Sequence, residues 1–592
     1  MSCPQRRAAQ RGFALILMAT VLILGVAWFT VGALGQVNLT TAAREQKTGA
    51  ALEKAKRALL AYVAQTASDT SQVDPGRMPC PEALSHPGTS YEGMAADQTT
   101  PFQSGALTCP SPVALGRLPW KTIGTDQIRD GYGELLWYAV GTGTWAPVNN
   151  GSTLTINPGT AGTLTFTSET VSTTVVAVIV APGPALFTAG LPAAPCTVVN
   201  QSNRTASVPY VTSNFLECGN ASGSTFTNVG PTSQWGNDRI ISITAAEVMD
   251  AISGAVADRM QRQVVPALET WRSTTSVASW GQSFMPFASS FSNPTSNDMC
   301  GDPSTVTAGG TSEGLPPTVT FSTATSTPVS NCIVDWRSAS ATGLGGLLSP
   351  LTQTCTITAL AGNQNRIQCS FTVIGGVVGQ IIAPTITATA NNVAYAFRSF
   401  GSAQVTVRKG SAGNPYQAAT IQGLSGSVSS ATGRGTISFQ VQIPALTLSD
   451  ILSGAAIRIR ITNATDGLST DSRVQWYLNN GWDRYSYYAA AQAMTANPGA
   501  FICTAANKTG CLTVAGWSTS NNDKRFLVVL TGRQLSSQTW PSSTLANYLE
   551  GGNLTTGDRT FDATSVSTTF NDRVSACPFT ATPAVGSALV LC

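Results

Sequence analysis

The chain has 592 residues, a formal net charge of +3 and only 11% charged residues, and it is rich in glycine. This length is enough for about two to four domains, each with its own core. The low charge content is typical of a β-rich extracytoplasmic protein and argues against a cytosolic enzyme. No block of like charge follows the first 12 residues, so the sequence gives no evident sign of a nucleic-acid partner.

An apolar segment near the N-terminus is the first element in chain order. Residues 13–35 carry no charge and follow a short basic stretch that ends at Arg11. As a helix of 23 residues the segment would be about 35 Å long, enough to cross a bilayer core of about 30 Å. Apolar residues keep a helical spacing from 36 to about 67, among charged ones. We therefore expect one long helix, apolar in its first half and amphipathic in its second.

Three interpretations of the apolar segment compete. A secretory signal peptide has a shorter apolar region of about 7–15 residues, although Gly32-Ala-Leu-Gly would serve as a cleavage site. A plain single-pass anchor also fits. The third interpretation depends on Gln10-Arg-Gly-Phe-Ala-Leu-Ile, which follows a basic leader and resembles the class III signal of the type IV pilin-like (prepilin-type) family.

The resemblance implies how the N-terminus is processed. A prepilin peptidase would cut after Gly12, and the new amine on Phe13 would be methylated. The helix would insert into the bacterial inner membrane and later pack beside other pilin or pseudopilin subunits. The family usually has Glu at the fifth mature position, where this chain has Leu17. An apolar residue there resembles certain minor pilins and pseudopilins, some of which lie at the filament tip.

The cysteines indicate an oxidising compartment. Twelve remain when Cys3 is removed with the leader, and no Cys-x-x-Cys is present. With His86 as the only histidine in the sequence, a zinc site is not expected. Pairing of sequence neighbours would give up to six local disulfides, although the sequence alone leaves the connectivity open. The expected pairs are Cys80/Cys109, Cys196/Cys218, Cys300/Cys332, Cys355/Cys369, Cys503/Cys511 and Cys577/Cys592.

An internal repeat organises the rest of the chain. Asn214-Phe-Leu-Glu-Cys-Gly-Asn returns as Asn547-Tyr-Leu-Glu-Gly-Gly-Asn, and Asn237-Asp-Arg-Ile returns as Asn571-Asp-Arg-Val. Four weaker matches keep the same order: Gly131–Ala139 with Gly481–Ala489, Val175–Gly183 with Phe526–Gly532, Met78-Pro79 with Met285-Pro286, and Leu118-Pro119 with Leu315-Pro316. A second, soluble helix should start at the capping box Thr244-Ala-Ala-Glu and be kinked or shortened at Pro266.

Residues 318–465 have no counterpart in the first copy and contain short β-branched or alternating segments, as in a β-sandwich. The predicted fold class is α+β: a long N-terminal transmembrane helix and two tandem pilin-like modules, each a helix with an antiparallel sheet. The predicted parts are a leader (1–12), the transmembrane helix (13–35), a first module (36–243), a split second module (244–317 and 466–592) and an inserted β-sandwich-like domain (318–465).

Two sets of residues are candidate sites. The acids and amides of the repeated motifs would suit Ca²⁺, which some pseudopilins bind in a late loop, or a structural turn in which an acid pairs with Arg239 or Arg573. The calcium candidates are Glu217, Asn220, Asp238, Glu550, Asn553 and Asp572. No other cofactor is expected. The aromatic run Trp476 to Tyr488 is either a carbohydrate-binding face or module core, and its echo in the first copy favours the core.

The sequence offers little for catalysis. Gly310-Thr-Ser-Glu-Gly matches G-x-S-x-G, but a nucleophile elbow needs a buried strand before it and a helix after it, and this stretch suggests neither. A Ser–His–acid triad would have to use His86. We predict no catalytic residues and no enzyme activity.

The predicted function is a structural or assembly subunit: a minor pilin or pseudopilin, at the filament tip, of a type IV pilus or type II secretion system. It would be anchored in the inner membrane with its globular part periplasmic or extracellular. Its partners would be other pilin or pseudopilin subunits, the prepilin peptidase, the membrane and a surface ligand of the insert. The alternative is a membrane-anchored or tip-mounted adhesin.

Overall fold

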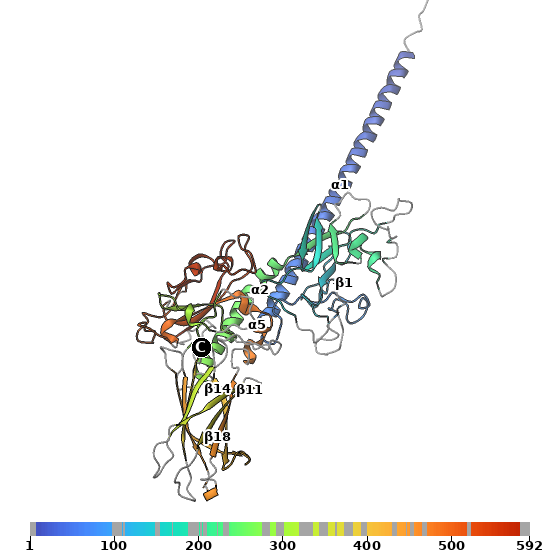
Figure 1. The fold of residues 1–592 in the computed structure, drawn as a ribbon. Coiled ribbons are helices and arrows are strands. Elements are labelled where there is room, and N and C mark those ends of the chain that lie inside the picture. Colours follow the sequence, from blue (N-terminus) through green and yellow to red (C-terminus); the bar gives the residue numbers. More distant parts are fainter. Residues whose placement is uncertain are drawn as a thin grey trace, which may run out of the picture. The chain divides into compact units, whose positions relative to one another are not determined.

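The structure is a computed structural model, shown in Figure 1. The side chains of residues 8–16 and 29–39 in the first helix lie outside what it describes. The described residues are 8–96, 109, 113–148, 154–168, 170–186, 201, 204, 210–221, 223–228, 236–274, 285–291, 301–318, 335–342, 353–360, 364–371, 383–391, 399–428, 435–443, 445, 447–449, 455–464, 471–495, 497–517 and 522–579.

The protein is α+β, with more sheet than helix. By its internal contacts the chain divides into two units. Unit 1 comprises Met1–Tyr62, Arg77–Leu154 and Ala161–Ala245, and unit 2 comprises Val63–Gly76, Thr155–Thr160 and Ala246–Cys592.

Helix α1 (Ala8–Ser68) is a single helix of 61 residues. No proline occurs between its first residue and Pro75, so nothing in the sequence breaks its hydrogen bonds. It ends where the Asp69 carboxylate accepts the backbone N–H of Ser71 at 2.9 Å, which starts a turn. Within the described residues, no helix is long and apolar enough to cross a membrane. The described residues therefore do not support the predicted transmembrane segment, residues 13–35. Within that segment, side chains are described only for residues 17–28.

Unit 1 contains one four-stranded antiparallel sheet and one smaller sheet. The larger has the order β1 (Val113–Arg117), β2 (Trp137–Gly141), β5 (Ala177–Ala181) and β7 (Arg239–Ile243). The smaller has the order β4 (Val171–Val175), β3 (Leu164–Ser168) and β6 (Thr225–Asn228), with β6 parallel to β3. Strands β2 and β5 are buried along their whole length, which explains their continuous apolar sequences.

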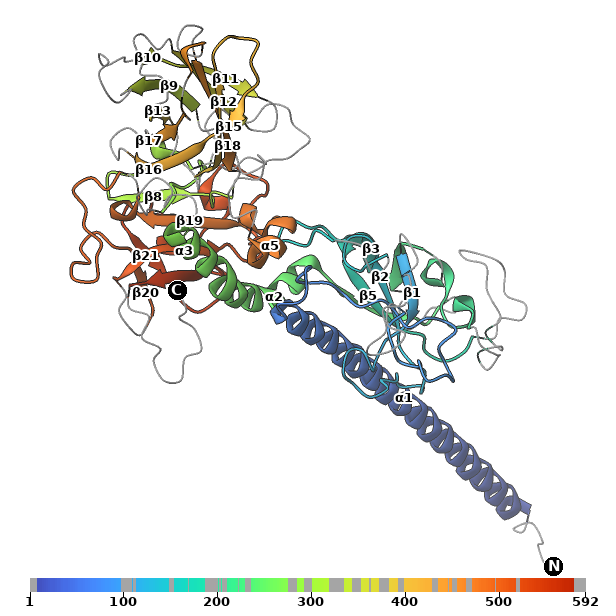
Figure 2. The same cartoon turned by 90° about the horizontal axis from the view of Figure 1, so that it is seen from below.

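Unit 2 repeats this topology (Figure 2). Its antiparallel sheet has the order β8 (Thr311–Gly314), β19 (Ser486–Ala491), β21 (Lys524–Leu530) and β23 (Arg573–Pro578). The parallel pair β20 (Thr513–Ala515) and β22 (Thr560–Asp562) corresponds to β3 and β6. A short helix, α5 (Gln475–Asn479), precedes β19.

The second helix is interrupted, as Pro266 leads one to expect. Helix α2 (Ala245–Arg259) passes into a π-helical turn, Met260–Val264, and continues as α3 (Val265–Thr274). Pro266 is the second residue of α3, where its missing N–H matters least because the wider π turn has already displaced the hydrogen-bonding pattern.

Strand register supports the sequence repeat at single-residue level. Tyr138 pairs with Ile179, which pairs with Ile241, and the corresponding residues in unit 2 are Tyr488, Val528 and Ser575. The first and third correspondences have the same offsets as the matched segments 131–139 and 237–240, and the second has the offset of Gly183 with Gly532.

One sequence match was wrong by one residue. Gly116 pairs with Tyr138, and Gly314 pairs with Tyr488, so Gly116 corresponds to Gly314 and Leu118 does not correspond to Leu315. The physical reason is a close backbone approach at these glycines. A Cβ on Gly116 would lie 2.2 Å from the carbonyl oxygen of residue 82, and one on Gly314 would lie 2.1 Å from that of residue 289.

The inserted segment forms two five-stranded antiparallel sheets (Figure 2). Core side chains come from both sheets, among them Ile386 and Phe439 from the first and Ile367 and Ile459 from the second. The first sheet is β10 (Gln353–Thr354), β9 (Asp335–Thr342), β13 (Thr385–Asn391), β17 (Gly435–Gln442) and β16 (Thr420–Val428). The second is β11 (Thr356–Leu360), β12 (Gln364–Phe371), β18 (Ala455–Ala464), β14 (Ser399–Lys409) and β15 (Gln417–Ala418).

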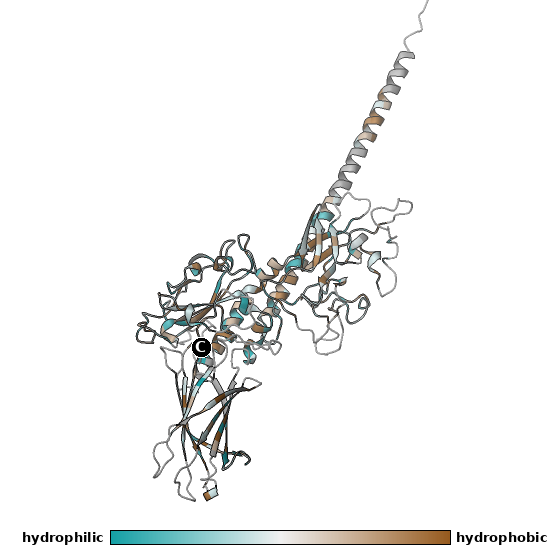
Figure 3. Cartoon of the chain, in the orientation of Figure 1, coloured by the Kyte–Doolittle hydropathy of each residue, from teal (hydrophilic) through white to brown (hydrophobic). Residues whose placement is uncertain are grey.

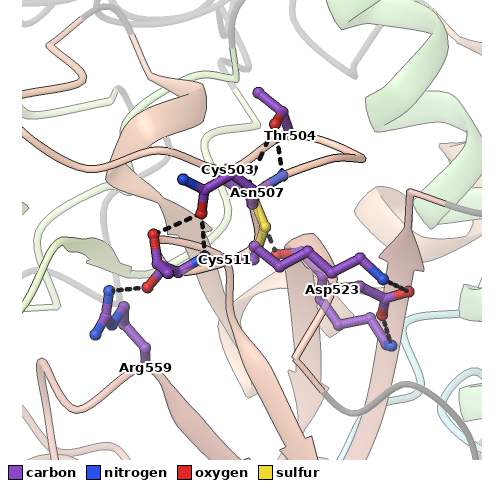
Figure 4. The surroundings of a disulfide bond; sticks show 9 residues. Cys503, Thr504, Asn507, Cys511, Asp523 and Arg559 are labelled. Carbon is purple, nitrogen blue, oxygen red and sulfur yellow. Dashed lines mark hydrogen bonds and ion pairs between the residues drawn. A yellow bond between two sulfur atoms is a disulfide. The ribbon is translucent and has the colours of Figure 1, made fainter.

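Three of the expected disulfides are present: Cys80–Cys109, Cys355–Cys369 and Cys503–Cys511. Figure 4 shows how the last one closes a short loop, in which the Asn507 side chain accepts the backbone N–H of Thr509 at 3.1 Å and Arg559 donates to the carbonyl of Thr509 at 2.8 Å. The remaining expected pairs each include a cysteine outside the described residues, namely Cys196, Cys300, Cys332 and Cys592.

Candidate functional site

The N-terminal part of α1 exposes a continuous apolar surface. Between residues 17 and 28 the large apolar side chains are all more than half exposed, up to 77% for Met18 and 84% for Trp28. Figure 3 shows hydrophobic residues on this stretch. They are Leu17, Met18, Val21, Leu22, Ile23, Leu24, Val26 and Trp28. Burying one such side chain stabilises a complex by about 1.5–3 kcal/mol, so this surface is suited to an apolar partner.

The predicted processing residues lie at the start of the same helix. Gly12 and Phe13 are both within α1, and their side chains are outside the described part. Leu17, where the family usually has Glu, is about half exposed.

The C-terminal part of α1 is fixed to unit 1. Its first buried side chain among those described is Thr48, whose hydroxyl accepts the backbone N–H of Gly131 at 3.0 Å. Gly131 approaches so closely that a Cβ would lie 2.1 Å from the carbonyl oxygen of Arg44. Glu45 accepts both Arg239 Nε at 3.0 Å and the Tyr132 hydroxyl at 3.3 Å. Within unit 1, which contains α1 as far as Tyr62, the helix is therefore held by the module from about residue 44.

The repeated Glu, Asn and Asp of unit 1 come together as one hydrogen-bonded cluster. Glu217 Oε2 accepts the backbone N–H groups of Asn237 and Asp238 at 2.9 and 3.0 Å. In return, Asp238 Oδ2 accepts the backbone N–H of Glu217 at 3.0 Å and Asn220 Nδ2 at 2.9 Å. Asn220 also bonds both backbone groups of Thr227, at 2.8 and 3.1 Å. This cluster joins the 3₁₀ turn Cys218–Ala221 to strands β6 and β7.

Unit 2 builds the same cluster from the second copy of the motif. Glu550 Oε2 accepts the backbone N–H of Asn571 at 2.9 Å, and Asp572 Oδ2 accepts the N–H of Glu550 at 3.0 Å. Asn553 donates to Asp572 Oδ2 at 2.9 Å and bonds both backbone groups of Asp562, at 2.7 and 3.3 Å. The second Glu oxygen also has an equivalent partner in each copy, since Gln201 and Gln538 donate to it at 2.7 and 2.6 Å. We call each cluster an Asp–Glu clasp: Glu217, Asn220 and Asp238 in unit 1, and Glu550, Asn553 and Asp572 in unit 2.

The two acids of each clasp are buried. Burial, and secondarily the neighbouring Glu217, raise the pKa of Asp238 well above its usual range. Burial and Glu550 do the same to the pKa of Asp572, and burial raises the pKa of Glu550. Asp238 and Asp572 should therefore lose their protons at a higher pH than exposed Asp carboxyls do.

The clasp residues suit a structural role better than a Ca²⁺ site. Calcium takes about six to eight oxygen ligands, whereas both Glu217 oxygens and one Asp238 oxygen already accept protein donors. One buried oxygen in each clasp, Oδ1 of Asp238 and of Asp572, has no hydrogen-bond partner in the described structure. Within the described residues no group of three or more His, Cys, Asp or Glu could hold a metal ion.

The arginines of the repeated Asn-Asp-Arg motif have different partners from those expected. Arg239 pairs with Glu45 of α1 at 3.0 Å instead of a clasp acid. Arg573 Nε donates to Ser253 Oγ of α2 at 3.3 Å. Because strand residues alternate in direction, Asp points to the clasp and the next residue, Arg, points to the helix. Each arginine thus ties a sheet to the helix of its own unit.

The aromatic run belongs to the core, as the repeat indicates. Trp476, Tyr477, Trp482, Tyr487 and Tyr488 are buried. The Tyr488 hydroxyl donates to the carbonyl of Pro286 at 3.1 Å, and Tyr138 makes the equivalent bond to Pro79 at 3.2 Å. A carbohydrate-binding face on these rings is therefore wrong.

The G-x-S-x-G match lies almost entirely in a strand. Thr311–Gly314 is β8, an edge strand buried along its length. Ser312 Oγ accepts the backbone N–H of Ala288 at 2.8 Å and bonds the Thr305 hydroxyl at 2.8 Å. His86 belongs to unit 1 and Ser312 to unit 2. The serine therefore joins neighbouring segments of the sheet edge.

A cavity of about 280 Å³ lies in unit 1. Arg204 extends along its wall, pairs with Glu134 at 3.3 Å and donates to the carbonyl of Gly183 at 2.7 Å. These contacts join the end of β5 to the turn before β2. The sequence did not indicate this cavity, because its lining residues come from distant segments: Pro87, Gly88, Glu92, Arg117, Arg129, Glu134, Leu135, Trp137, Arg204, Tyr210 and Phe215.

Comparison of the chain with protein-family models, curated proteins and solved structures found no match.

Proposed function

We propose that this chain is a structural or assembly subunit of pilin-like type, a minor pilin or pseudopilin at a filament tip, of a type IV pilus or type II secretion system. In this proposal residues 13–35 insert into the bacterial inner membrane and then pack beside the helices of other subunits. The two repeated units are pilin-like helix-plus-sheet modules, and the insert is a β-sandwich that faces the periplasm or the cell exterior.

The observation that carries the proposal is the contrast between the two parts of α1. About 40 residues of helix, or about 60 Å, precede the buried Thr48. The eight large apolar side chains between residues 17 and 28 are exposed. Covering them would contribute on the order of 10–20 kcal/mol, so a lipid bilayer or a bundle of like helices is a strongly favourable environment. After residue 44 the same helix is bound firmly to a folded module, which would couple the module to a filament.

The N-terminal sequence supports the same class. The basic leader, Gly12 and Phe13 provide the features that a prepilin peptidase would recognise, and the Leu17 position favours a minor subunit over the repeating one. The observed disulfides are compatible with an oxidising compartment outside the cytoplasm.

A second candidate is a membrane-anchored or tip-mounted adhesin, in which the insert binds a surface ligand. The observation in its favour is the net positive charge of the insert, which contains eight basic residues and only two acidic ones. The two candidates are compatible, since a tip subunit can also bind a ligand.

Photo-crosslinking in a bacterial host tests the proposal. A photo-crosslinking amino acid at position 24, on the exposed part of α1, should give adducts with other pilin-like subunits. The matched control is the same amino acid at position 59, where Leu59 is fully buried. Equal crosslinking at both positions, or adducts at position 24 with no pilin-like protein, would contradict the proposal.

A further inference from the structure

The insert has a larger net positive charge than the whole protein. Its 148 residues, 318–465, contain eight basic and two acidic residues and no glutamate, a net charge of +6. The whole chain has only +3, so the rest of the protein is net negative. The basic residues are Arg337, Arg366, Arg398, Arg408, Lys409, Arg434, Arg458 and Arg460, and the acidic ones are Asp335 and Asp450.

Strand pairing gathers four of these arginines on one sheet. Strand β12 pairs with β18, and β18 pairs with β14. The register places Arg366 directly opposite Arg460, while Arg458 lies between Gln368 on one side and Thr406 on the other. We call the outward surface of these three strands the basic face; its residues are Arg366, Gln368, Gln404, Thr406, Arg408, Arg458 and Arg460.

Alternation along the strands places these residues on the outer side. Residues 367 and 369, 405 and 407, and 457 and 459 are buried in the core. Arg366, Arg408 and Arg458 at the intervening positions are partly exposed, and Gln404 is exposed. Since successive side chains of a strand point to opposite faces, the basic face is one continuous surface.

Within the described residues, the arginines of the basic face have no acidic partners. The five strands of this sheet contain no Asp or Glu, and in the described structure none of Arg366, Arg408 and Arg458 forms an ion pair. Like charges directly opposite each other in a sheet are destabilising. An anionic ligand on the basic face would therefore reduce the repulsion among its arginines.

We propose that the basic face binds an acidic polysaccharide, a polymer that carries carboxylates on its sugar rings. Guanidinium groups bind carboxylates through paired hydrogen bonds. The strands are about 4.8 Å apart, and alternate residues along a strand are about 6.8 Å apart, so the arginines form a grid on which successive charged rings can lie. Gln404 and Thr406, between the arginines, can hydrogen-bond sugar hydroxyls.

The aromatic content of the face disfavours single-stranded nucleic acid, which needs rings on which bases stack. Tyr416 is the aromatic residue beside the described face, and it is covered by arginines, with the guanidinium carbon of Arg458 3.8 Å and that of Arg408 5.6 Å from the ring centre. Arg458 is also oriented by Gln368, to which its Nε donates at 2.8 Å. Recognition would therefore depend on charge and hydroxyl contacts. This inference rests on the proposed function in one respect, because it names the surface ligand that the insert would bind.

The test uses the full-length protein in detergent, with immobilised polygalacturonate as the probe and uncharged dextran and duplex DNA as comparisons. The face variant carries Arg366→Gln, Arg458→Gln and Arg460→Gln. The matched control carries Arg337→Gln, Lys54→Gln and Arg57→Gln, which remove the same charge from exposed positions elsewhere.

We expect saturable binding to polygalacturonate that weakens at least tenfold in the face variant, less than twofold in the control, and steeply with added salt. No binding to polygalacturonate, equal losses in the two variants, or tighter binding to DNA than to polygalacturonate would overturn the inference. A folded face variant is recognised by an unchanged circular dichroism spectrum. It should still be crosslinked into filaments through position 24, so failure of ligand binding and failure of the proposed function are separate results.

Discussion

The asparagines of the two clasps offer a matched pair of perturbations. Asn220→Ala removes three hydrogen bonds, to Asp238 Oδ2 and to both backbone groups of Thr227, at 2.8–3.1 Å. Asn553→Ala removes the equivalent three in unit 2, at 2.7–3.3 Å. Each bond contributes about 1 kcal/mol, and the buried Asp and the two backbone groups each lose one partner, so each variant should be destabilised by about 2–4 kcal/mol.

The assay must resolve the two units, because a chain of this size does not unfold in one step. Hydrogen exchange measured by mass spectrometry does so. Asn220→Ala should lower protection in β6 and β7 and leave β22 and β23 unchanged, and Asn553→Ala should do the reverse. Gln422→Ala, on an exposed position of β16, is the control. A loss below about 0.5 kcal/mol in either variant, or a loss in both units, would refute the reasoning that the clasps are equivalent structural elements.

Three further predictions concern pH, packing and metal. Burial raises the pKa of Glu82 to about 7, whereas the same carboxyl in the unfolded chain has a pKa of about 4.3. Between these two pH values the folded protein keeps a proton that the unfolded chain releases. The free energy of unfolding of unit 1 should therefore fall by on the order of 3 kcal/mol as pH rises from about 4 to 7. Glu82→Gln should flatten this dependence in hydrogen exchange, and an unchanged pH profile would contradict it. Gly116→Ala and Gly314→Ala should each destabilise their own unit by about 1–3 kcal/mol, because the new Cβ would meet a backbone carbonyl oxygen. Gly413→Ala is the control and should not destabilise the protein, because a Cβ there would have no atom within 4 Å. Thermal unfolding of the three variants measures the difference. Calcium or a chelator should move the melting temperature by less than about 1 °C, and a rise of several degrees with calcium would show that the clasps bind it.

The repeat could be predicted because its strongest matches are the residues whose side chains make identical contacts in the two units. Glu217 and Glu550 each bond the backbone of an Asn-Asp pair, so substitution at either end would break a buried bond. The Leu-Pro match failed because two residues carry little information. The position that matters there is the glycine, whose close backbone approach is visible only in space.

Partners across the sheet could not be predicted from sequence spacing. Arg239 was expected to pair with an acid of its own motif, yet its partner is Glu45, on a helix almost 200 residues earlier. The basic face could not be predicted from the sequence either. Arg366, Arg408 and Arg458 are 40–50 residues apart in sequence, and only the pairing of β12, β18 and β14 brings them together. Local patterning predicts strands and which of their faces is buried, but not which strands are neighbours.

The most direct test of the proposed function is the intact mass and N-terminal sequence of the protein, taken from membranes of its native host with and without prepilin peptidase. The proposal predicts a mature chain that begins at methylated Phe13 only when the peptidase is present. A chain that keeps Met1 in both cases, or one cut near Gln36 by ordinary signal peptidase, would contradict it.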